Sequence, residues 1–353
     1  MFAATFFDGE EWRDGVIGLV DGRMLLRDEP APAALPRLDG VIVGGFTDHH
    51  VHLQLVDHAR LAGSPLGRVV DLGANPEVVA RLAAAARHAA LHNSGDSASS
   101  RGGYADSPPH DAGLPELWSA GDAHPLQIRF AGAFLTPPRG YPSDRDWAPD
   151  GSFREITDAA SAGRAVAEMA DAGASCIKVA SNAHAGPVFG DDLFRAIVEL
   201  AAARGLDVVT HAEGPGEAQR VTRLGARRLA HAPFTERLDD DEIAAQAASV
   251  SWISTLAIHS GADLTVAVAN VRRFHAAGGT VLYGTDMGNG PTPVGLNSAE
   301  LAALRDAGLD DAALLRALAP VDPRTPSAVL LLLPARTADL SLAHPLTAAD
   351  LKV

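Results

Sequence analysis

The chain has 353 residues, 47% of them hydrophobic, and a formal net charge of −15 from 29 basic and 44 acidic side chains. That length fits one large domain with a small appendage, and the charge argues against nucleic acid or an anionic membrane as a partner. No secretory signal or membrane-length apolar run is visible, and Cys176 is the single cysteine, so an intramolecular disulfide is impossible. We therefore expect a cytoplasmic protein that acts on a small molecule, and we leave homo-oligomerisation open.

The N-terminal segment predicts a small β unit. Short apolar runs alternate with polar turns there, and Asp21-Gly22 between two such runs is a hairpin signal. We expect residues 1–40, with part of 321–353, to form a small β-sandwich-like appendage. Residues 41–320 would then form the main domain.

Short apolar runs alternate with helical patterns through the main domain. The predicted strands are 41–46, 68–72, 127–135, 175–180, 207–211, 228–231, 249–256 and 280–284, and the predicted helices are 76–92, 159–172, 191–204, 239–248 and 263–277. This alternation predicts an α/β fold of the (β/α)8 TIM barrel type. A doubly wound open sheet is the alternative, but no Gly-x-Gly-x-x-Gly follows a strand. The aperiodic segment 93–125 is rich in Ser, Gly, Asp and Pro, which predicts a long surface loop.

Two histidines stand at the end of the first predicted strand. The stretch from Gly44 to His52 reads Gly-Gly-Phe-Thr-Asp-His-His-Val-His and follows the β-branched run 41–43. Because side chains alternate along a strand, His50 and His52 point to the same side. Two imidazoles on one face can bind a single metal ion, although a solvated turn or a core histidine explains this stretch equally well on its own.

Lysine usage singles out one residue of the predicted strand 175–180. Only two of the 29 basic residues are lysines, Lys178 and the near-terminal Lys352. Lys178 lies in an otherwise uncharged strand pattern, where an unpaired lysine would be costly to bury. Burial lowers the pKa of a lysine, and a neutral amine can react with carbon dioxide to give a carbamate with two ligand oxygens. Such a group can bridge two metal ions.

Three further predicted strands end in a potential metal ligand. The 33 residues from Lys178 to His211 and the 20 from there to His231 each fit one strand–helix unit, and Asp286 follows two units later. Any one of these histidines fits a core position, but ligand-type side chains at so many strand ends favour a metal centre at the C-terminal face of the barrel. The side chains that then converge are His50, His52, Lys178, His211, His231 and Asp286.

With these residues at its predicted strand ends, the sequence resembles the amidohydrolase superfamily. The segment from Gly45 to His52 is similar to the first-strand signature of that family, with Gly44 where proline is usual. The residues that match its bridging lysine, two further histidines and final aspartate are Lys178, His211, His231 and Asp286.

Shorter segments resemble one branch of this superfamily. Residues 173–179 and the pair Thr255-Leu256 resemble the imidazolonepropionase-like and prolidase-like branch. Residues 336–340 resemble a degenerate version of the closing β-strand of the family. The small β appendage is therefore expected to be reduced.

The resemblance implies a binuclear hydrolase. By it, one divalent cation would be held by His50, His52 and Asp286, the other by the two downstream histidines, and a carbamate on Lys178 would bridge them. A metal-bridging hydroxide would cleave an amide, lactam, imide or lactone bond of a small molecule, and Asp286 would be the catalytic proton shuttle. Zinc suits an imidazole-rich site best, with manganese or iron as alternatives.

Loops at this face of a barrel select the substrate. Arg139, Tyr141, His184 and His259 lie in such loops and are candidates for holding it, although each is equally explained as an ordinary loop residue. Asp48 has the same strand parity as the two histidines and either orients a ligand or caps the backbone.

Two other functions remain open. A mononuclear deaminase of a cyclic amidine or nucleobase-like substrate is similar in fold, but deaminases of this superfamily typically lack the bridging lysine. A non-catalytic barrel retained for binding is the other, and the full set of ligands weighs against it.

Overall fold

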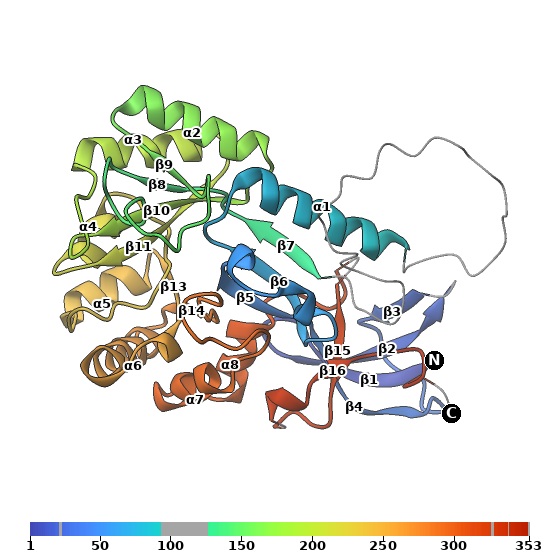
Figure 1. Ribbon diagram of the computed structural model, residues 1–353. Coiled ribbons are helices and arrows are strands. Elements are labelled where there is room, and N and C mark those ends of the chain that lie inside the picture. Colours follow the sequence, from blue (N-terminus) through green and yellow to red (C-terminus); the bar gives the residue numbers. More distant parts are fainter. Residues whose placement is uncertain (21–22, 93–125, 326–327, 338, 352–353) are drawn as a thin grey trace, which may run out of the picture.

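The computed structural model describes residues 1–20, 23–92, 126–325, 328–337 and 339–351. Within these residues the strands form three sheets, and the helices lie outside the central strands (Figure 1). The predicted turn at Asp21-Gly22 and the predicted loop 93–125 fall outside the described residues.

The six-stranded sheet joins the two ends of the chain in the order β16-β15-β4-β1-β2-β3. Its strands are β1 (Phe2–Phe7), β2 (Trp12–Val20), β3 (Arg23–Arg27), β4 (Arg37–Gly44), β15 (Leu330–Leu333) and β16 (His344–Pro345). Strand β15 pairs antiparallel with β4 along its whole length, from Leu330 opposite Gly44 to Leu333 opposite Val41. Phe6, Ile17 and Ile42, all fully buried, centre the apolar core of this sheet. The expected separate β unit is therefore present, while its boundaries as a domain stay a prediction.

The remaining strands are parallel to their neighbours and form two sheets. One contains β5 (Phe46–Val51), β6 (Leu66–Asp71) and β7 (Gln127–Phe130). The other runs in the order β14-β13-β12-β11-β10-β8-β9, with β8 (Phe134–Thr136), β9 (Phe153–Glu155), β10 (Cys176–Asn182), β11 (Asp207–Glu213), β12 (Arg228–Leu229), β13 (Ser251–Ile253) and β14 (Thr280–Leu282).

Backbone hydrogen bonds join both edges of the three-stranded sheet, β5 and β7, to segments next to β14 and β10 of the other sheet. On one side the His49 amide donates to the carbonyl of Tyr283 at 2.9 Å, and on the other the Ser175 amide donates to Phe130 at 2.8 Å. The curled sheets give a barrel-like α/β domain whose interior holds a small apolar cluster that includes Cys176. The α/β class and the additional β sheet are confirmed, and closure into one eight-stranded barrel stays a prediction.

The helices bury one face each against the strands. They are α1 (Pro76–His92), α2 (Ala159–Asp171), α3 (Asp191–Ala202), α4 (Glu217–Arg223), α5 (Asp240–Ala247), α6 (Gly261–Ala276), α7 (Ser298–Asp306) and α8 (Asp311–Leu318). Helix α3 shows the pattern: Phe194, Ile197 and Ala201 recur at helical spacing and are buried. Aspartates begin three of the helices as N-caps, namely Asp158, Asp239 and Asp310. None of the described helices is long and apolar enough to cross a membrane.

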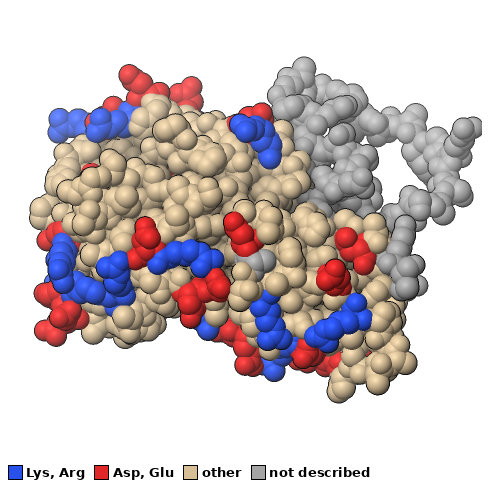
Figure 2. Space-filling model, turned by 90° about the horizontal axis from the view of Figure 1, so that it is seen from below, with Lys and Arg blue, Asp and Glu red and all other residues tan. Residues whose placement is uncertain are grey.

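Basic and acidic side chains mix on the surface. Figure 2 shows them interspersed around the rim of one face, with a broad uncharged area between them. The acidic side chains on this face therefore do not form a single patch.

Three strand predictions need correction. Residues 41–44 belong to β4 of the six-stranded sheet, and the chain passes at Gly45 into β5. A Cβ atom on Gly45 would lie 2.9 Å from the Cα of Gly67. The single strand predicted over 127–135 is split into β7 and β8, because Gly132 takes a left-handed conformation at φ +77. The closing strand is β15, whereas the described residues of 336–340 form a turn that leads into a 3-10 helix at Leu340–Leu342.

Candidate metal centre

The six predicted ligands line one cavity of about 330 Å³ at the C-terminal ends of the parallel strands. The first two share β5 and the residue just beyond it, Lys178 and His211 lie within β10 and β11, and the last two follow β12 and β14. All six side chains are buried: His50, His52, Lys178, His211, His231 and Asp286. The structure thus brings together every residue that the sequence predicted as a ligand, and their role in holding metal stays a prediction.

Three of these groups form a compact triad. The ligand atoms of His50, His52 and Asp286 lie within 4.8 Å of one another. Asp286 Oδ1 lies 3.2 Å from His50 Nε2 and 3.1 Å from His52 Nε2. The Nδ1 atoms of the two rings donate to backbone carbonyls, His50 to Ala230 at 2.8 Å and His52 to Gly73 at 3.1 Å. The Nε2 atoms therefore face the carboxylate with their lone pairs unless a proton or a cation lies between them.

The charges in the triad fit a cation site. Burial raises the pKa of Asp286, but the rings of His50 and His52 outweigh burial and hold its pKa well below the usual range. Burial lowers the pKa of His52, but the carboxylate of Asp286 outweighs it and raises that pKa. Burial and Lys178 keep the pKa of His50 well below its usual value. A divalent cation would replace the proton shared by these groups, which is the usual coupling of metal binding to proton release.

The other two histidines are oriented in the same way by outer partners. His211 Nε2 donates to Glu213 Oε2 at 3.0 Å, which leaves its Nδ1 with a free lone pair. His231 Nδ1 lies 2.8 Å from the Thr255 hydroxyl, so its Nε2 is the nitrogen left for a metal. Their ring centroids are 4.8 Å apart, and that of His231 is also 4.8 Å from that of His50. A pair of imidazoles in such fixed orientations, each with one free nitrogen, is a second place for a divalent cation.

Lys178 lies between the triad and this pair. Its side chain is 1% exposed, and its Nζ is 3.5 Å from His50 Nε2. Burial lowers its pKa to about 8, against the pull of Asp286 in the other direction. An amine with this pKa is partly neutral near neutral pH, and the neutral amine is the form that attacks carbon dioxide.

Buried groups behind the ligands fix their strand ends. Asp48 accepts hydrogen bonds from the Thr285 hydroxyl at 2.5 Å, the Thr285 amide at 3.1 Å and the His50 amide at 3.0 Å. It therefore ties β5 to the segment that carries Asp286. Asp286 has φ +52, a left-handed conformation that costs free energy in a residue other than glycine and that the surrounding hydrogen bonds must maintain.

Sequence reasoning missed several of these supports. Glu213 has the same strand parity as His211, and this signal could have identified it. Asn289 donates to Asp286 Oδ2 at 2.7 Å from the loop after β14, and no sequence pattern marks it.

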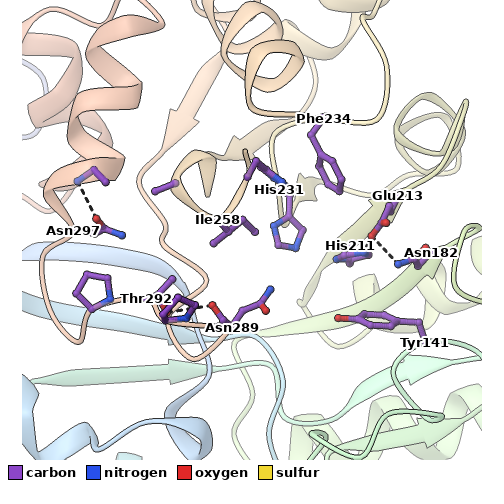
Figure 3. A pocket seen from close by; sticks show the side chains of 16 residues that line it. Tyr141, Asn182, His211, Glu213, His231, Phe234, Ile258, Asn289, Thr292 and Asn297 are labelled. Atoms are coloured by element: carbon purple, nitrogen blue, oxygen red, sulfur yellow. Dashed lines mark hydrogen bonds and ion pairs between the residues drawn. The ribbon is translucent and has the colours of Figure 1, made fainter. Parts of the chain in front are cut away.

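A second cavity, which we call the outer cavity, has a volume of about 550 Å³ and adjoins the first; Figure 3 shows the residues that line it. Tyr141, His211, His231 and Asn289 line both cavities, and His259 lines the outer one. Of the four predicted substrate contacts, Tyr141 and His259 thus face a cavity. Arg139 and His184 line neither of these two cavities: Arg139 bonds through its amide to Glu155, and His184 is largely exposed beside Glu213.

Known structures share this fold. The crystal structure of A. niger ochratoxinase has a TM-score of 0.68 at 15% identity, covering 94% of this chain and 89% of that one. A putative prolidase from Bifidobacterium longum has a TM-score of 0.64 at 22% identity, covering 98% and 91%. A Xaa-Pro dipeptidase with bound methionine has a TM-score of 0.64 at 14% identity, covering 98% and 99%. No curated protein matches the chain.

The family itself is identified from the sequence. The model of the amidohydrolase family matches residues 41–319, which is most of the chain and includes all six predicted ligands. We conclude that the chain belongs to the amidohydrolase family and is a metal-dependent hydrolase that acts on carbon–nitrogen bonds.

Proposed function

We propose that this protein is a binuclear hydrolase that cleaves an amide, lactam, imide or lactone bond of a small molecule at the C-terminal face of a (β/α)8 barrel. The observation that carries the proposal is the position of Lys178, a fully buried amine between the histidine–aspartate triad and the second histidine pair. The ammonium of Lys178 would repel metal ions held beside it, whereas its carbamate would be an anionic bridge between them.

The proposed ligand sets follow the geometry. His50, His52 and Asp286 would hold one cation, His211 and His231 the other, and carbamylated Lys178 would bridge them. Two such cations, preferably zinc, would supply a hydroxide near neutral pH and polarise the scissile carbonyl.

Residues of the chain would complete the reaction. Asp286 is the group placed to take a proton and pass it to the leaving nitrogen or oxygen, and the amide of Asn289 holds its Oδ2 in position. Burial and the nearby carboxylates of Asp286 and Glu213 raise the pKa of the Tyr141 phenol. Tyr141 therefore stays protonated and can donate a hydrogen bond to a substrate oxygen in the cavity that it lines.

The test combines metal content with turnover. Protein loaded with zinc or manganese in the presence of bicarbonate should contain close to two metal ions per chain by elemental analysis. It should hydrolyse members of a panel of N-acyl amino acids and amides, cyclic imides and lactones, and Lys178→Ala should lose metal and activity together. One metal per chain under all loading conditions, with release of ammonia from cyclic amidines, would instead indicate the mononuclear deaminase.

A further inference from the structure

The outer cavity must hold the part of the substrate that does not react, if the bond is cleaved at the proposed metal centre. Tyr141, His211, His231 and Asn289 line both cavities, so the two spaces adjoin at these side chains, and we take them as two parts of one substrate site. The outer cavity, about 550 Å³, is large enough for an aromatic group with a polar substituent.

One side of the outer cavity is apolar. The rings of Phe234 and His259 lie against each other with centroids 4.1 Å apart and planes 31° apart. Ile258, Pro291 and Pro293 extend this wall. Such a surface binds an aliphatic or aromatic group through burial of apolar area.

The other side carries a single full charge. In Figure 3, Glu213 lies beside Asn182 and His211, across the cavity from Ile258. Among the described residues that line the outer cavity, Glu213 is the only acidic one, and none is lysine or arginine. Because Glu213 is partly buried, its repulsion of a second negative charge is only partly screened by water. A ligand carboxylate next to Glu213 is therefore disfavoured.

One oxygen of Glu213 is saturated and the other is not. Oε2 accepts hydrogen bonds from His211 Nε2 at 3.0 Å and from Asn182 Nδ2 at 2.7 Å. Oε1 has His184 Nδ1 at 3.9 Å, beyond hydrogen-bond distance, and that imidazole is more than half exposed. Glu213 can therefore accept a further hydrogen bond from a ligand without giving up its hold on His211.

The arginine that lies over the Tyr141 ring does not reverse the balance of charge. Arg145 lies over the Tyr141 ring, 5.8 Å from its centroid, and its Nε is 3.3 Å from Asp144. It lines neither cavity, and its charge is already partnered.

We propose that the outer cavity selects substrates whose distal part is apolar and ends in an ammonium or another hydrogen-bond donor, and rejects those that end in a carboxylate, with Glu213 as the specificity-determining residue. This inference rests on the proposed function for the position of the reacting bond. It predicts that free dipeptides and N-acyl amino acids are poor substrates compared with the matching amides and amines.

The test uses three para-substituted benzohydroxamates as probes, with an aminomethyl, a carboxamide or a carboxylate substituent. The hydroxamate anchors each probe at the metal centre in the same way, so differences in affinity report the outer cavity. Calorimetric titration of the metal-loaded protein should show the ammonium probe binding about tenfold more tightly than the carboxamide, and the carboxylate about tenfold more weakly. These differences should shrink as ionic strength rises.

Two variants identify the charge responsible. Glu213→Gln should reduce the spread between the three probes to about twofold, and its metal content is measured in parallel. Glu199→Gln makes the same change in net charge on the exposed face of α3 and should leave the spread intact. If Glu213→Gln loses metal through its contact with His211, the order of the probes on the wild-type protein and its salt dependence still decide the question.

The outcomes separate this inference from the proposed function. A carboxylate probe that binds as tightly as the ammonium probe, or a spread that survives in metal-loaded Glu213→Gln, would overturn the inference while leaving hydrolysis unaffected. Conversely, metal-loaded protein that binds the probes in the predicted order but hydrolyses no corresponding amide, imide or lactone would overturn the proposed function and retain the inference.

Discussion

Thr255 offers a test of whether a hydrogen bond to a proposed metal ligand, His231, sets the affinity of one of the two proposed metal sites. Its hydroxyl lies 2.8 Å from His231 Nδ1, and the residue is fully buried. Its backbone has φ +44, and its amide donates to Gly284 at 3.0 Å, so the main chain is held independently of the side chain. Thr255→Ala should weaken metal binding at the His211–His231 pair by about 10- to 100-fold, the usual effect of losing such a partner.

Thr255→Ser is the matched control. Serine keeps the hydroxyl and, like alanine, removes the β-branch that is unfavourable at positive φ, so the two variants differ mainly in the hydrogen bond to His231. In metal-free protein the unpaired imidazole nitrogen of Thr255→Ala should lower the free energy of unfolding by about 1–3 kcal/mol relative to Thr255→Ser.

Competition with a chromophoric chelator measures both metal affinities, and urea titration measures stability. We expect Thr255→Ala to lose affinity for one equivalent of zinc much more than for the other, because Thr255 contacts neither His50 nor His52. If the two variants bind both equivalents with affinities within about twofold of each other, the hydroxyl does not orient His231 and the reasoning is refuted.

Three further predictions concern other buried charges. Asp286→Asn keeps a ligand oxygen but removes the proton acceptor, so metal content should largely persist while kcat falls by about 10²- to 10⁴-fold; an unchanged kcat excludes the proton-shuttle role. Lys178→Ala should regain part of its activity with added short-chain carboxylic acids, which replace the missing carbamate, whereas Lys178→Ala with two metals and full turnover would contradict the bridge. Burial raises the pKa of Glu300 from 4.5 to about 7, so the unfolded chain loses this proton first and stability should fall by about 3 kcal/mol from pH 4.5 to 7. Glu300→Gln should remove that part of the fall in urea titrations, and an equally steep fall in the variant would rule Glu300 out as its source.

The ligands could be predicted because each one interrupts an apolar strand pattern. Lys178 interrupts a strand in which every residue is buried, and His211 ends the buried β-branched run 208–210; a charged or polar side chain there needs a chemical reason. Spacing by strand–helix units then predicted that these residues lie at one end of the sheets. The same local signals gave most helices to within two residues, because caps such as Asp158 and buried apolar faces act within one or two turns.

The errors arose where tertiary contacts decide. Nothing local shows that the chain changes sheets at Gly45, since the close approach of Gly67 that requires a glycine there comes from another strand. Likewise the closing strand β15 is chosen by its pairing with β4 and not by its own propensity. Contacts such as that between Thr255 and His231 join residues 24 positions apart and depend on the register of β12 and β13.

The charge balance of the metal centre explains why its residues belong together. Without metal, the buried ionisable groups near the histidines include the amine of Lys178 and the carboxyl groups of Asp286 and Asp71. Two divalent cations in this setting would leave a large uncompensated positive charge in a low-dielectric interior, at high cost. Conversion of Lys178 to a carbamate changes its charge from positive to negative and adds ligand oxygens at the same position. Metal loading and carbamylation would therefore stabilise each other, so the proposed roles of the lysine and the aspartate both depend on the proposed cations.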